Sequence, residues 1–569
     1  MVSRRRAPAC CPMSSRRPAT SRDRCTSASS TKCSSDATAG AYAQTSMTAA
    51  PTAPATIERP ESSSGSPPAG ADPCVLLILG ASGDLTHRKL IPSMYEMHCL
   101  GALHPSTAIL GMSRTAKTDE SWRAELRTAV QASVQGFDPA RWHSFEERLF
   151  YHAGDAATQA AYPALVERLG ALAAARATRG NILFYLSVAP SLYEPIVQCI
   201  DEAGLVSEGK RWCSIDPKGR SWQRIVVEKP FGTDEASAAS LNRALGRVFE
   251  EDSTYRIDHY LGKDLVQSLL VLRFANSIFE PVWNHRYIDH VQITAAETVG
   301  VGTRGGFYEQ TGAVRDMIQS HLMQVLAFVA MEPPNRMRAN EIRSEKIKLI
   351  GAIRPTAAAE VATHGAFGQY GAGPDPSYAQ LQGVAPGSTV ETFAALKLHL
   401  DTWRWAGTPF YLRTGKAMRA KRTEVVVQFK APAADLFKDV PHGAGGVQGN
   451  RLVIEIAPRE RAELRFESKV PGRRMAIAPI AMQADFRKEF GGHPVEAYGP
   501  LIVDAMRGDQ SLFKHRTEVE GAWSAVMPFL DARSAPLREG IVGNYAQGSW
   551  GPRAADDLML RDGRAWHDG

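Results

Sequence analysis

An apolar segment followed at once by a glycine turn restricts most strongly what this chain can fold into. Residues 74–79 (Cys-Val-Leu-Leu-Ile-Leu) form a continuous apolar run, typical of a strand buried on both faces. Gly80-Ala81-Ser82-Gly83-Asp84-Leu85 follows, and a helix is predicted from Lys89 to Leu100. Strand, glycine turn and helix in this order begin a dinucleotide-binding unit, in which a pyrophosphate lies at the helix N-terminus. The full GxGxxG spacing is not met, because position 82 is serine.

Arg114 bears on which dinucleotide the unit would hold. A second strand is predicted at residues 108–111, and Arg114 follows it closely. A site for NAD usually places an acidic residue near this point, whereas an arginine suits the 2′-phosphate of NADP. The sequence therefore favours NADP. The alternative is a surface arginine at a strand end without this role.

Further strands indicate a parallel, doubly wound α/β sheet. Residues 120–180 are predicted to be helical, and residues 182–190 and 224–232 each read as a strand that runs into a loop. In such a sheet, ligands contact the carboxyl ends of the strands. Tyr185 and Lys229 lie at such ends. Lys229 precedes Pro230 in the loop where substrate and nicotinamide should meet.

From about residue 289 the pattern changes to that of a second domain of the α+β class. Residues 364–389 are rich in Gly, Pro and Tyr and are expected to form a long surface loop. The strand candidates predict a large, mainly antiparallel sheet, and they lie at residues 291–298, 392–400, 410–413, 423–429, 452–456 and 462–466.

The length of 569 residues also predicts two domains, because it exceeds what one core usually serves. Residues 1–72 are rich in Ser, Thr, Ala, Pro and Arg, with Tyr42 as the only aromatic residue, so we predict a disordered extension. An organellar transit peptide is an alternative, but no amphipathic helical period supports it. We expect an NADP-binding Rossmann domain at 73–256 and an α+β substrate-binding and oligomerisation domain at 257–569.

Charge and cysteine content exclude several classes of function. The formal net charge is +6, and residues 1–72 hold nine Lys/Arg against five Asp/Glu, which leaves about +2 for the rest. This balance gives no case for nucleic-acid binding. No apolar run approaches the roughly 18–20 residues that span a membrane. The eight cysteines show no CxxC or metal-ligand spacing, which predicts a reducing, cytoplasmic setting and no metal site.

Residues 255–263 (Tyr-Arg-Ile-Asp-His-Tyr-Leu-Gly-Lys) concentrate polar chemistry in a segment with apolar positions of its own. Asp258 would repel a phosphate, so it makes more sense as the orienting partner of a base elsewhere in the chain. The alternative is a charged turn without function. Four side chains donate hydrogen bonds and could together hold a phosphate: Arg256, His259, Tyr260 and Lys263.

His321 is the candidate base. It lies on a helix predicted at residues 314–326, near the face that carries Asp316 and Ser320. A histidine on a mostly apolar helix is more often a core residue than a catalyst. Oxidation of a sugar hydroxyl by NADP⁺, however, needs a base that titrates near neutrality and a carboxylate that orients it. His321 and Asp258 meet both needs if the fold brings them together, and Lys416 would join the residues that hold the phosphate.

With these motifs, the chain resembles the glucose-6-phosphate dehydrogenases from about Cys74 to its C-terminus. The resemblance implies oxidation of glucose 6-phosphate to 6-phosphogluconolactone with formation of NADPH, the first step of the oxidative pentose phosphate pathway, by a homodimer or homotetramer. Six segments carry it: GASGDLTHRKLIP at 80–92, RIVVEKPFG at 224–232, RIDHYLGK at 256–263, AVRDMIQSHLMQVL at 313–326, FYLRTGKAMRAKR at 410–422 and GSWGPRAADDL at 548–558.

The resemblance also implies roles for single residues. It makes His321 the proton acceptor and Asp258 its partner. The positions that bind the sugar phosphate are His259, Tyr260, Lys263 and Lys416. Further substrate contacts fall on Lys229, Glu297, Asp316 and Lys421, with Lys229 also near the cofactor. The cofactor-side positions are Gly80, Ala81, Ser82, Gly83, Asp84, Leu85, Lys89, Arg114 and Tyr185.

Some positions depart from the family pattern, and alternatives remain. Ala457 stands where many members have glutamine, Ser320 replaces a frequent asparagine, and Thr86-His87 replaces Ala-Lys. None removes a catalytic group, so they bear on affinity and sugar preference. Other Rossmann sugar oxidoreductases share the Glu-Lys-Pro segment but lack RIDHYLGK. Another hexose phosphate remains an alternative substrate. A non-enzymatic homologue would be expected to have lost His321 or Asp258.

Overall fold

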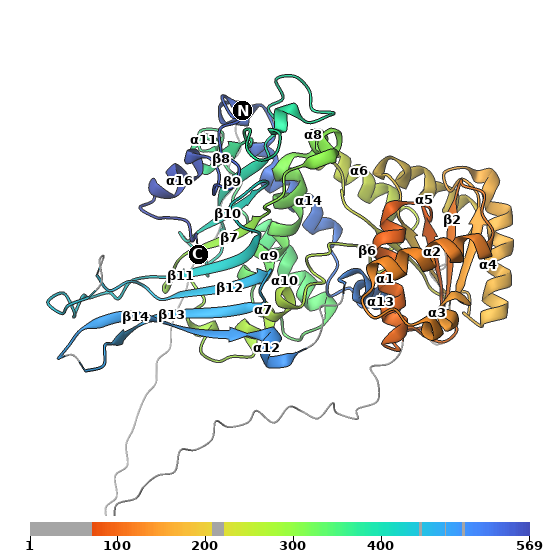
Figure 1. Cartoon of the computed structure of the whole chain (residues 1–569), viewed down its shortest axis with the longest axis horizontal. Helices are drawn as coiled ribbons and strands as arrows, with labels where there is room; N and C mark the ends of the chain where they lie inside the picture. The colour runs from red at the N-terminus through yellow and green to blue at the C-terminus, as the bar shows by residue number, and fades with distance from the viewer. Residues whose placement is uncertain (1–70, 207–220, 443–445, 473, 492–495, 569) are drawn as a thin grey trace, which may run out of the picture. The chain divides into compact units, whose positions relative to one another are not determined.

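The computed structural model describes residues 71–206, 221–442, 446–472, 474–491 and 496–568 (Figure 1). The extension predicted at 1–72 lies outside the described residues, apart from its last two. The described residues belong to one compact unit, Pro67–Gly569. The division at residues 72 and 256 stays a prediction.

Six parallel strands form the first sheet in the order β3-β2-β1-β4-β5-β6. The order reverses between β1 and β4, and dinucleotides bind at such a reversal. The predicted Rossmann-type sheet is confirmed. The strands are β1 (Val75–Leu79), β2 (Ala108–Ser113), β3 (Leu149–Ala153), β4 (Ile182–Leu186), β5 (Gln223–Val227) and β6 (Thr254–Arg256).

Helices cover both faces of this sheet. Val75, Leu77 and Leu79 of β1 belong to one apolar core, while Leu76 and Ile78 belong to another. The apolar run thus forms a strand buried on both faces, as predicted. The first core also takes in α4 (Tyr162–Arg176) and α5 (Tyr193–Glu202), and the second takes in α1 (Ile91–Cys99), α2 (Asp119–Ser133), α3 (Pro139–Glu146) and α13 (Tyr498–Arg507).

The prediction of helix throughout residues 120–180 was wrong at β3. This strand lies at the sheet edge, where Leu149 and Tyr151 are buried and Phe150 and His152 only half-buried. Its five residues therefore lack the continuous apolar run that marks the central strands.

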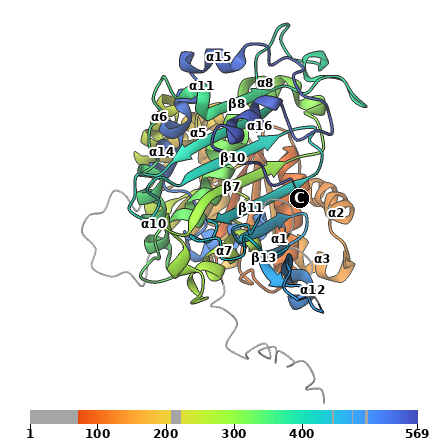
Figure 2. The same cartoon turned by 90° about the vertical axis from the view of Figure 1, so that its left-hand side faces the viewer.

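Eight strands form the second sheet in the order β14-β13-β12-β11-β7-β10-β9-β8, and all neighbours except β7 and β10 are antiparallel. Figure 2 looks onto this sheet. The predicted, mainly antiparallel sheet is confirmed. Its strands are β7 (Ile288–Ala296), β8 (Gly365–Gly368), β9 (Phe393–His399), β10 (Pro409–Gly415), β11 (Arg422–Phe429), β12 (Arg451–Ala457), β13 (Arg461–Lys469) and β14 (Ile477–Asp485).

Two strands depart from the sequence prediction. The surface loop expected at 364–389 begins instead with β8, whose four residues are buried and pair with β9. Small residues let this strand pack closely. The same glycines led the sequence analysis to predict a loop here. β14 was not predicted, because most of its residues are exposed and its sequence shows no alternation of apolar and polar residues.

Helices pack on the side of the second sheet that faces β6 (Figure 1). The most important is a π-helix, η8 (Val314–Leu322), which contacts β7 and β10 and continues as α9 (Met323–Ala330). The helix predicted at 314–326 is thus present, with a wider first part. Its neighbours include α7 (Asp264–Phe274), α8 (Gly305–Ala313), α10 (Ala339–Gly351) and α14 (Arg516–Val526). None of the described helices is long and apolar enough to cross a membrane.

Candidate active site

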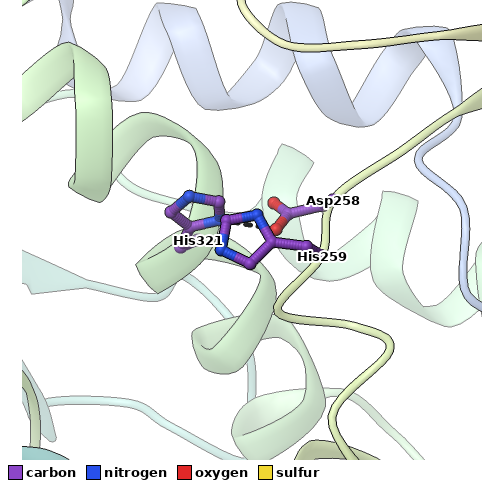
Figure 3. Close-up of side chains that lie close together, drawn as sticks. All are labelled: Asp258, His259 and His321. Atoms are coloured by element: carbon purple, nitrogen blue, oxygen red, sulfur yellow. Dashed lines mark hydrogen bonds and ion pairs between the residues drawn. The ribbon is translucent and has the colours of Figure 1, made fainter. Parts of the chain in front are cut away.

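The loop after β6 and the π-helix η8 bring Asp258 and His321 together (Figure 3). Nδ1 of His321 lies 2.5 Å from Oδ1 of Asp258, and each side chain is only 1% exposed. The two candidate catalytic residues, 63 positions apart in the chain, therefore form one buried pair.

Local geometry at Gly312 sets the start of η8. Gly312 has φ 64°, and a Cβ there would lie 2.7 Å from Oε1 of Glu391. That same oxygen accepts a hydrogen bond from the backbone N–H of Val314 at 3.1 Å. Arg538 holds the other carboxylate oxygen of Glu391 at 2.6 Å. A glycine conformation and a buried carboxylate thus direct the helix that carries His321.

The hydrogen bonds of His321 assign its tautomer. Nδ1 faces the Asp258 carboxylate and therefore carries the proton, which leaves the lone pair on Nε2. Nζ of Lys229 lies 2.8 Å from Nε2, and it also donates to the backbone oxygen and Oδ1 of Asp316, at 2.9 Å each. His321 is therefore a neutral imidazole, and its basic nitrogen lies next to Lys229.

Burial and charge keep the imidazole neutral. Burial lowers the pKa of His321 to about 3; the Asp258 carboxylate opposes this shift, and the Lys229 charge adds to it. Burial would raise the pKa of Asp258, but His321 and Lys514 hold that pKa well below its usual range. Asp258 is thus ionised and His321 is unprotonated, as a base must be before it acts.

The candidate phosphate site extends from the imidazole along residues 259–263. The Tyr260 ring stacks on His321, with centroids 4.3 Å apart, and Nζ of Lys263 lies 3.7 Å from the centre of the Tyr260 ring. Burial lowers the pKa of Lys263 to about 8 and that of His259 to about 4, and other cations nearby add to both shifts. A phosphate dianion would relieve the repulsion among these groups.

The strands β7 and β10 supply the other side of this site. Just after their ends, Nζ of Lys416 lies 2.5 Å from Oε2 of Glu297. Lys421 is exposed, and its charge lowers the pKa of Lys263. The structure therefore gathers all the candidate substrate residues around His321 or along this side.

Arg256 does not join them, and that part of the sequence interpretation was wrong. Its side chain is 2% exposed, and it bonds Oε1 of Glu251 at 2.7 Å and Oδ1 of Asn242 at 3.1 Å. As the last residue of β6, Arg256 is tied to the helix α6 (Glu235–Gly246) and the turn before β6.

The glycine turn after β1 fits a dinucleotide. Gly80 has φ 99°, and a Cβ there would lie 2.0 Å from the backbone oxygen of Ser187 at the end of β4. The turn therefore lies at the crevice between β1 and β4, and its residue Ala81 is buried. Ser82 and Gly83 lead into the helix that opens at Asp84 and Leu85, whose N-terminus suits a pyrophosphate.

The other candidate cofactor residues near this crevice differ in their contacts and exposure. Ser82 Oγ lies 2.7 Å from Oγ of Ser113 in β2, and the next residue, Arg114, is exposed. Tyr185 is fully buried and donates a hydrogen bond to Glu228, whose pKa burial raises to about 7. Tyr185 thus supports the residue before Lys229 and offers no exposed surface of its own.

A cleft of about 910 Å³ lies between the first helix of the parallel sheet and the loop after β6. Lys89 lines it from the first helix, and His259 and Lys263 line it from the loop after β6. Nζ of Lys89 lies 2.6 Å from Oε2 of Glu496. Ala457, which departs from the family pattern, also lines this cleft.

Ser320, a second departure from the family pattern, lies beside the base on η8. Its hydroxyl donates to the backbone oxygen of Asp316 at 3.0 Å. The substitution thus leaves the contacts of His321 and Asp258 in place.

Asp258, His259 and His321 also lie close enough to be considered as metal ligands, with ligand atoms within 4.8 Å of one another. The ammonium groups of Lys514 and Lys229 lie 2.8 Å from the remaining ligand atoms, Oδ2 of Asp258 and Nε2 of His321. A divalent cation would have to displace both lysines. The arrangement therefore suits a base and its carboxylate better than a metal.

Sequence reasoning missed three residues of this site: Glu228, Glu496 and Lys514. Glu228 lies within the motif at 224–232, so its burial was the missing information. Lys514 and Glu496 come from the C-terminal part of the chain, in segments without a catalytic motif. No local pattern indicates that they reach the residues around Asp258 and Lys89.

Comparisons with known proteins agree on one family. The model "Glucose-6-phosphate dehydrogenase, NAD binding domain" matches residues 77–268, and "Glucose-6-phosphate dehydrogenase, C-terminal domain" matches residues 270–567. The glucose-6-phosphate 1-dehydrogenase of Aggregatibacter actinomycetemcomitans is 42% identical over 501 residues, which are 87% of this chain and 97% of that protein.

Two solved structures are similar along almost their whole length. One is a glucose-6-phosphate dehydrogenase in complex with its substrate glucose-6-phosphate, with a TM-score of 0.78 and 30% identity. The other is glucose-6-phosphate 1-dehydrogenase from Mycobacterium avium, with a TM-score of 0.74 and 33% identity. Each comparison covers 88% of this chain and 99% of the other.

Proposed function

Because the chain belongs to the glucose-6-phosphate dehydrogenase family, we propose that it oxidises D-glucose 6-phosphate to 6-phospho-D-glucono-1,5-lactone while NADP⁺ is reduced to NADPH. This is the glucose-6-phosphate 1-dehydrogenase reaction, EC 1.1.1.49, which opens the oxidative pentose phosphate pathway. The observation that carries the proposal is the buried 2.5 Å pair of His321 and Asp258 beside a group of cations.

His321 acts as the base. Its Nε2 takes the proton of the C1 hydroxyl as the C1–O bond becomes a carbonyl. Asp258 keeps Nδ1 protonated and stabilises the imidazolium that forms, and a base in this position contributes about 10²–10⁴ in rate. NADP⁺, when bound, would supply the acceptor for the hydride that leaves C1.

Lys229 positions the reacting carbon. Its ammonium lies next to Nε2 of His321 and is held there by Asp316. A sugar hydroxyl that bonds Nε2 must share this position, so Lys229 would donate to the sugar as it enters. The hydroxyl is then held between a donor and the base, a geometry that favours proton transfer.

The phosphate binds at the cationic side of the site, on His259, Tyr260, Lys263 and Lys416. Glu297 and Lys421 complete the substrate contacts. The negative charge of the phosphate offsets the positive charge that forms on His321 during the reaction. The binding energy of the phosphate group also positions C1, the reacting carbon, which the phosphate does not contact.

NADP is the proposed cofactor because an exposed arginine, Arg114, follows the second strand of the sheet. The glycine turn and the helix that follows would hold the pyrophosphate, through Gly80, Ala81, Ser82, Gly83, Asp84 and Leu85. Lys89 and Lys229 would lie beside the bound cofactor, and Tyr185 would support Lys229 through its hydrogen bond to Glu228.

We also propose a homodimer or homotetramer that works in the cytoplasm. The hairpin β13–β14 reaches beyond the helices, and exposed apolar side chains lie on or next to it, Met475, Ile480 and Met482 among them. A second copy of the chain would cover them. The free cysteines Cys74, Cys99 and Cys199 fit a reducing compartment.

The initial rate of NADPH formation, followed by absorbance, tests the proposal. Rapid turnover is expected with glucose 6-phosphate and NADP⁺, and much slower turnover with glucose or with NAD⁺. Galactose 6-phosphate tests the alternative sugar. Folded protein that turns over no hexose phosphate would contradict the proposed reaction.

A further inference from the structure

The two oxygens of Asp258 contact groups of different kinds. Oδ1 accepts from His321 at 2.5 Å and from the backbone N–H of Tyr260 at 3.1 Å. Oδ2 forms an ion pair with Nζ of Lys514 at 2.8 Å. Lys514 is only 2% exposed, so water does not screen this pair. The carboxylate behind the base is therefore shared between an imidazole and an ammonium group.

The fold holds Lys514 firmly in this place. Its backbone N–H donates to the carbonyl of Arg256 at 3.2 Å, which forms an antiparallel bridge next to β6. Phe513 packs edge-on against Tyr255, with ring centroids 4.8 Å apart. The Lys514 ammonium also lies 5.7 Å from the centre of the Phe231 ring. A side chain so anchored is built into the site.

The charges around the pair come from several elements. Lys229 and Glu228 follow β5, Asp316 lies on η8, and His259 neighbours Asp258. Glu518 of α14 faces Lys514, but it is itself paired with Lys346 at 3.0 Å, and both are fully buried. Asp316 is matched by Lys229, which leaves Asp258 and Lys514 as each other's charge partners.

We propose that Lys514 is a positioning residue of this reaction: it neutralises Asp258 in part and so keeps His321 unprotonated and ready to accept the substrate proton. Without this second partner, the full charge of the buried carboxylate would stabilise the imidazolium and raise the pH below which the base is protonated. The inference rests on the proposed function.

The test is the pH dependence of kcat in Lys514→Met. Only the unprotonated imidazole accepts a proton, so kcat falls below the pKa of His321 in the substrate complex. Removal of a cation near an imidazole–carboxylate pair raises that pKa, and we expect the acid limb to move up by about 1–2 pH units. KM for glucose 6-phosphate should change little. We follow kcat and not kcat/KM, because the phosphate group of free glucose 6-phosphate also gains a proton as the pH falls below about 6.

Two variants separate this effect from simple loss of a buried cation. Arg273→Met removes a cation that is equally buried but paired with Glu280, so it should lower the melting temperature and leave the acid limb in place. Lys514→Arg keeps the charge and should keep the wild-type limb. An acid limb that stays in place in Lys514→Met would overturn the inference.

Further outcomes are also decisive. If Lys514→Met does not fold, Lys514→Gln is used, because it keeps the polar contact without the charge, and the same upward shift is expected. If neither folds, ¹⁵N NMR of the wild-type histidines decides: an imidazolium at His321 near neutral pH contradicts the inference. Wild-type protein without activity toward glucose 6-phosphate overturns the proposed function instead.

Discussion

Nζ of Lys229 lies 2.8 Å from Nε2 of His321, the nitrogen that points away from Asp258. The basic nitrogen thus lies against a lysine. Asp316 holds this lysine, and although burial opposes the shift, the Lys229 charge lowers the pKa of Asp316 to about 2. The substrate hydroxyl has to meet the base and the lysine at the same point, which explains why a small misplacement of either would be costly.

Loss of the base is the first prediction. His321→Asn should lower kcat by about 10²–10⁴, because the amide cannot accept the substrate proton. NADP⁺ affinity, measured by fluorescence titration, should stay near wild type. His143→Asn, at an exposed histidine of α3, serves as the control. An equal loss of cofactor affinity in His321→Asn would speak against the role of base.

Loss of the carboxylate should affect both activity and stability. Asp258→Asn leaves Lys514 buried without its charge partner, and breaking a buried pair in this way costs about 3–5 kcal/mol in the free energy of unfolding. kcat should fall as well, because the imidazolium loses its counter-charge. Urea unfolding and initial rates measure the two effects. Asp401→Asn, which breaks an exposed pair with Arg354, should hardly change either.

The same carboxylate predicts how stability depends on pH. The pKa of Asp258 is lower in the folded protein than in the unfolded chain, so its contribution is complete above the unfolded value of about 4. The contribution is lost as the pH falls through the lower folded value. The stability difference between wild type and Asp258→Asn should therefore shrink below about pH 4, provided that both stay folded.

Lys263 predicts an alkaline rise in KM. Its pKa is lowered to about 8, so the ammonium is charged below that pH and is lost above it. KM for glucose 6-phosphate should rise above about pH 8, and Lys263→Met should have a high KM at every pH. The KM for glucose should not respond, since glucose has no phosphate. Lys348→Met, at an exposed lysine, is the control.

Arg114→Ala tests the choice of cofactor. Loss of a hydrogen bond to a charged group costs about 1.5–3 kcal/mol, or roughly 10–100-fold in KM for NADP⁺. KM for NAD⁺ should stay nearly constant, because it has no 2′-phosphate. Arg141→Ala, at an exposed arginine of α3, controls for surface charge. An unchanged ratio of the two values would move the 2′-phosphate contact elsewhere.

Gly80→Ala tests the glycine turn. A Cβ at this residue would lie 2.0 Å from the Ser187 carbonyl, in addition to the strain of φ 99°. Gly101→Ala is a matched control, because φ is 69° there but nothing lies within 4 Å of the added carbon. The control should lose about 1 kcal/mol. Gly80→Ala should lose clearly more and bind NADP⁺ weakly, as thermal melts and titration would show.

The sequence by itself determined where the parallel sheet starts and the nature of both sheets. The structure of residues 74–85 follows from local preferences. A continuous apolar run forms a buried strand, and glycine adopts a backbone conformation in the turn that other residues avoid. The strands of the second sheet were predictable where the sequence has apolar runs or alternation, and not at β8 or β14. The motif around Asp258 was enough to indicate a site and a family resemblance, because its residue types occur together at a fixed spacing.

Only the tertiary structure decided which side chains converge. It directed Arg256 toward Glu251 and away from the phosphate residues, and it brought Lys514 from the C-terminal part of the chain onto Asp258. The physical reason is that strand and turn depend on neighbouring residues, whereas an ion pair at 2.8 Å depends on how distant segments pack. From sequence alone, a lysine in a segment without a motif is predicted to be solvent-exposed, and only the tertiary structure shows that it is buried.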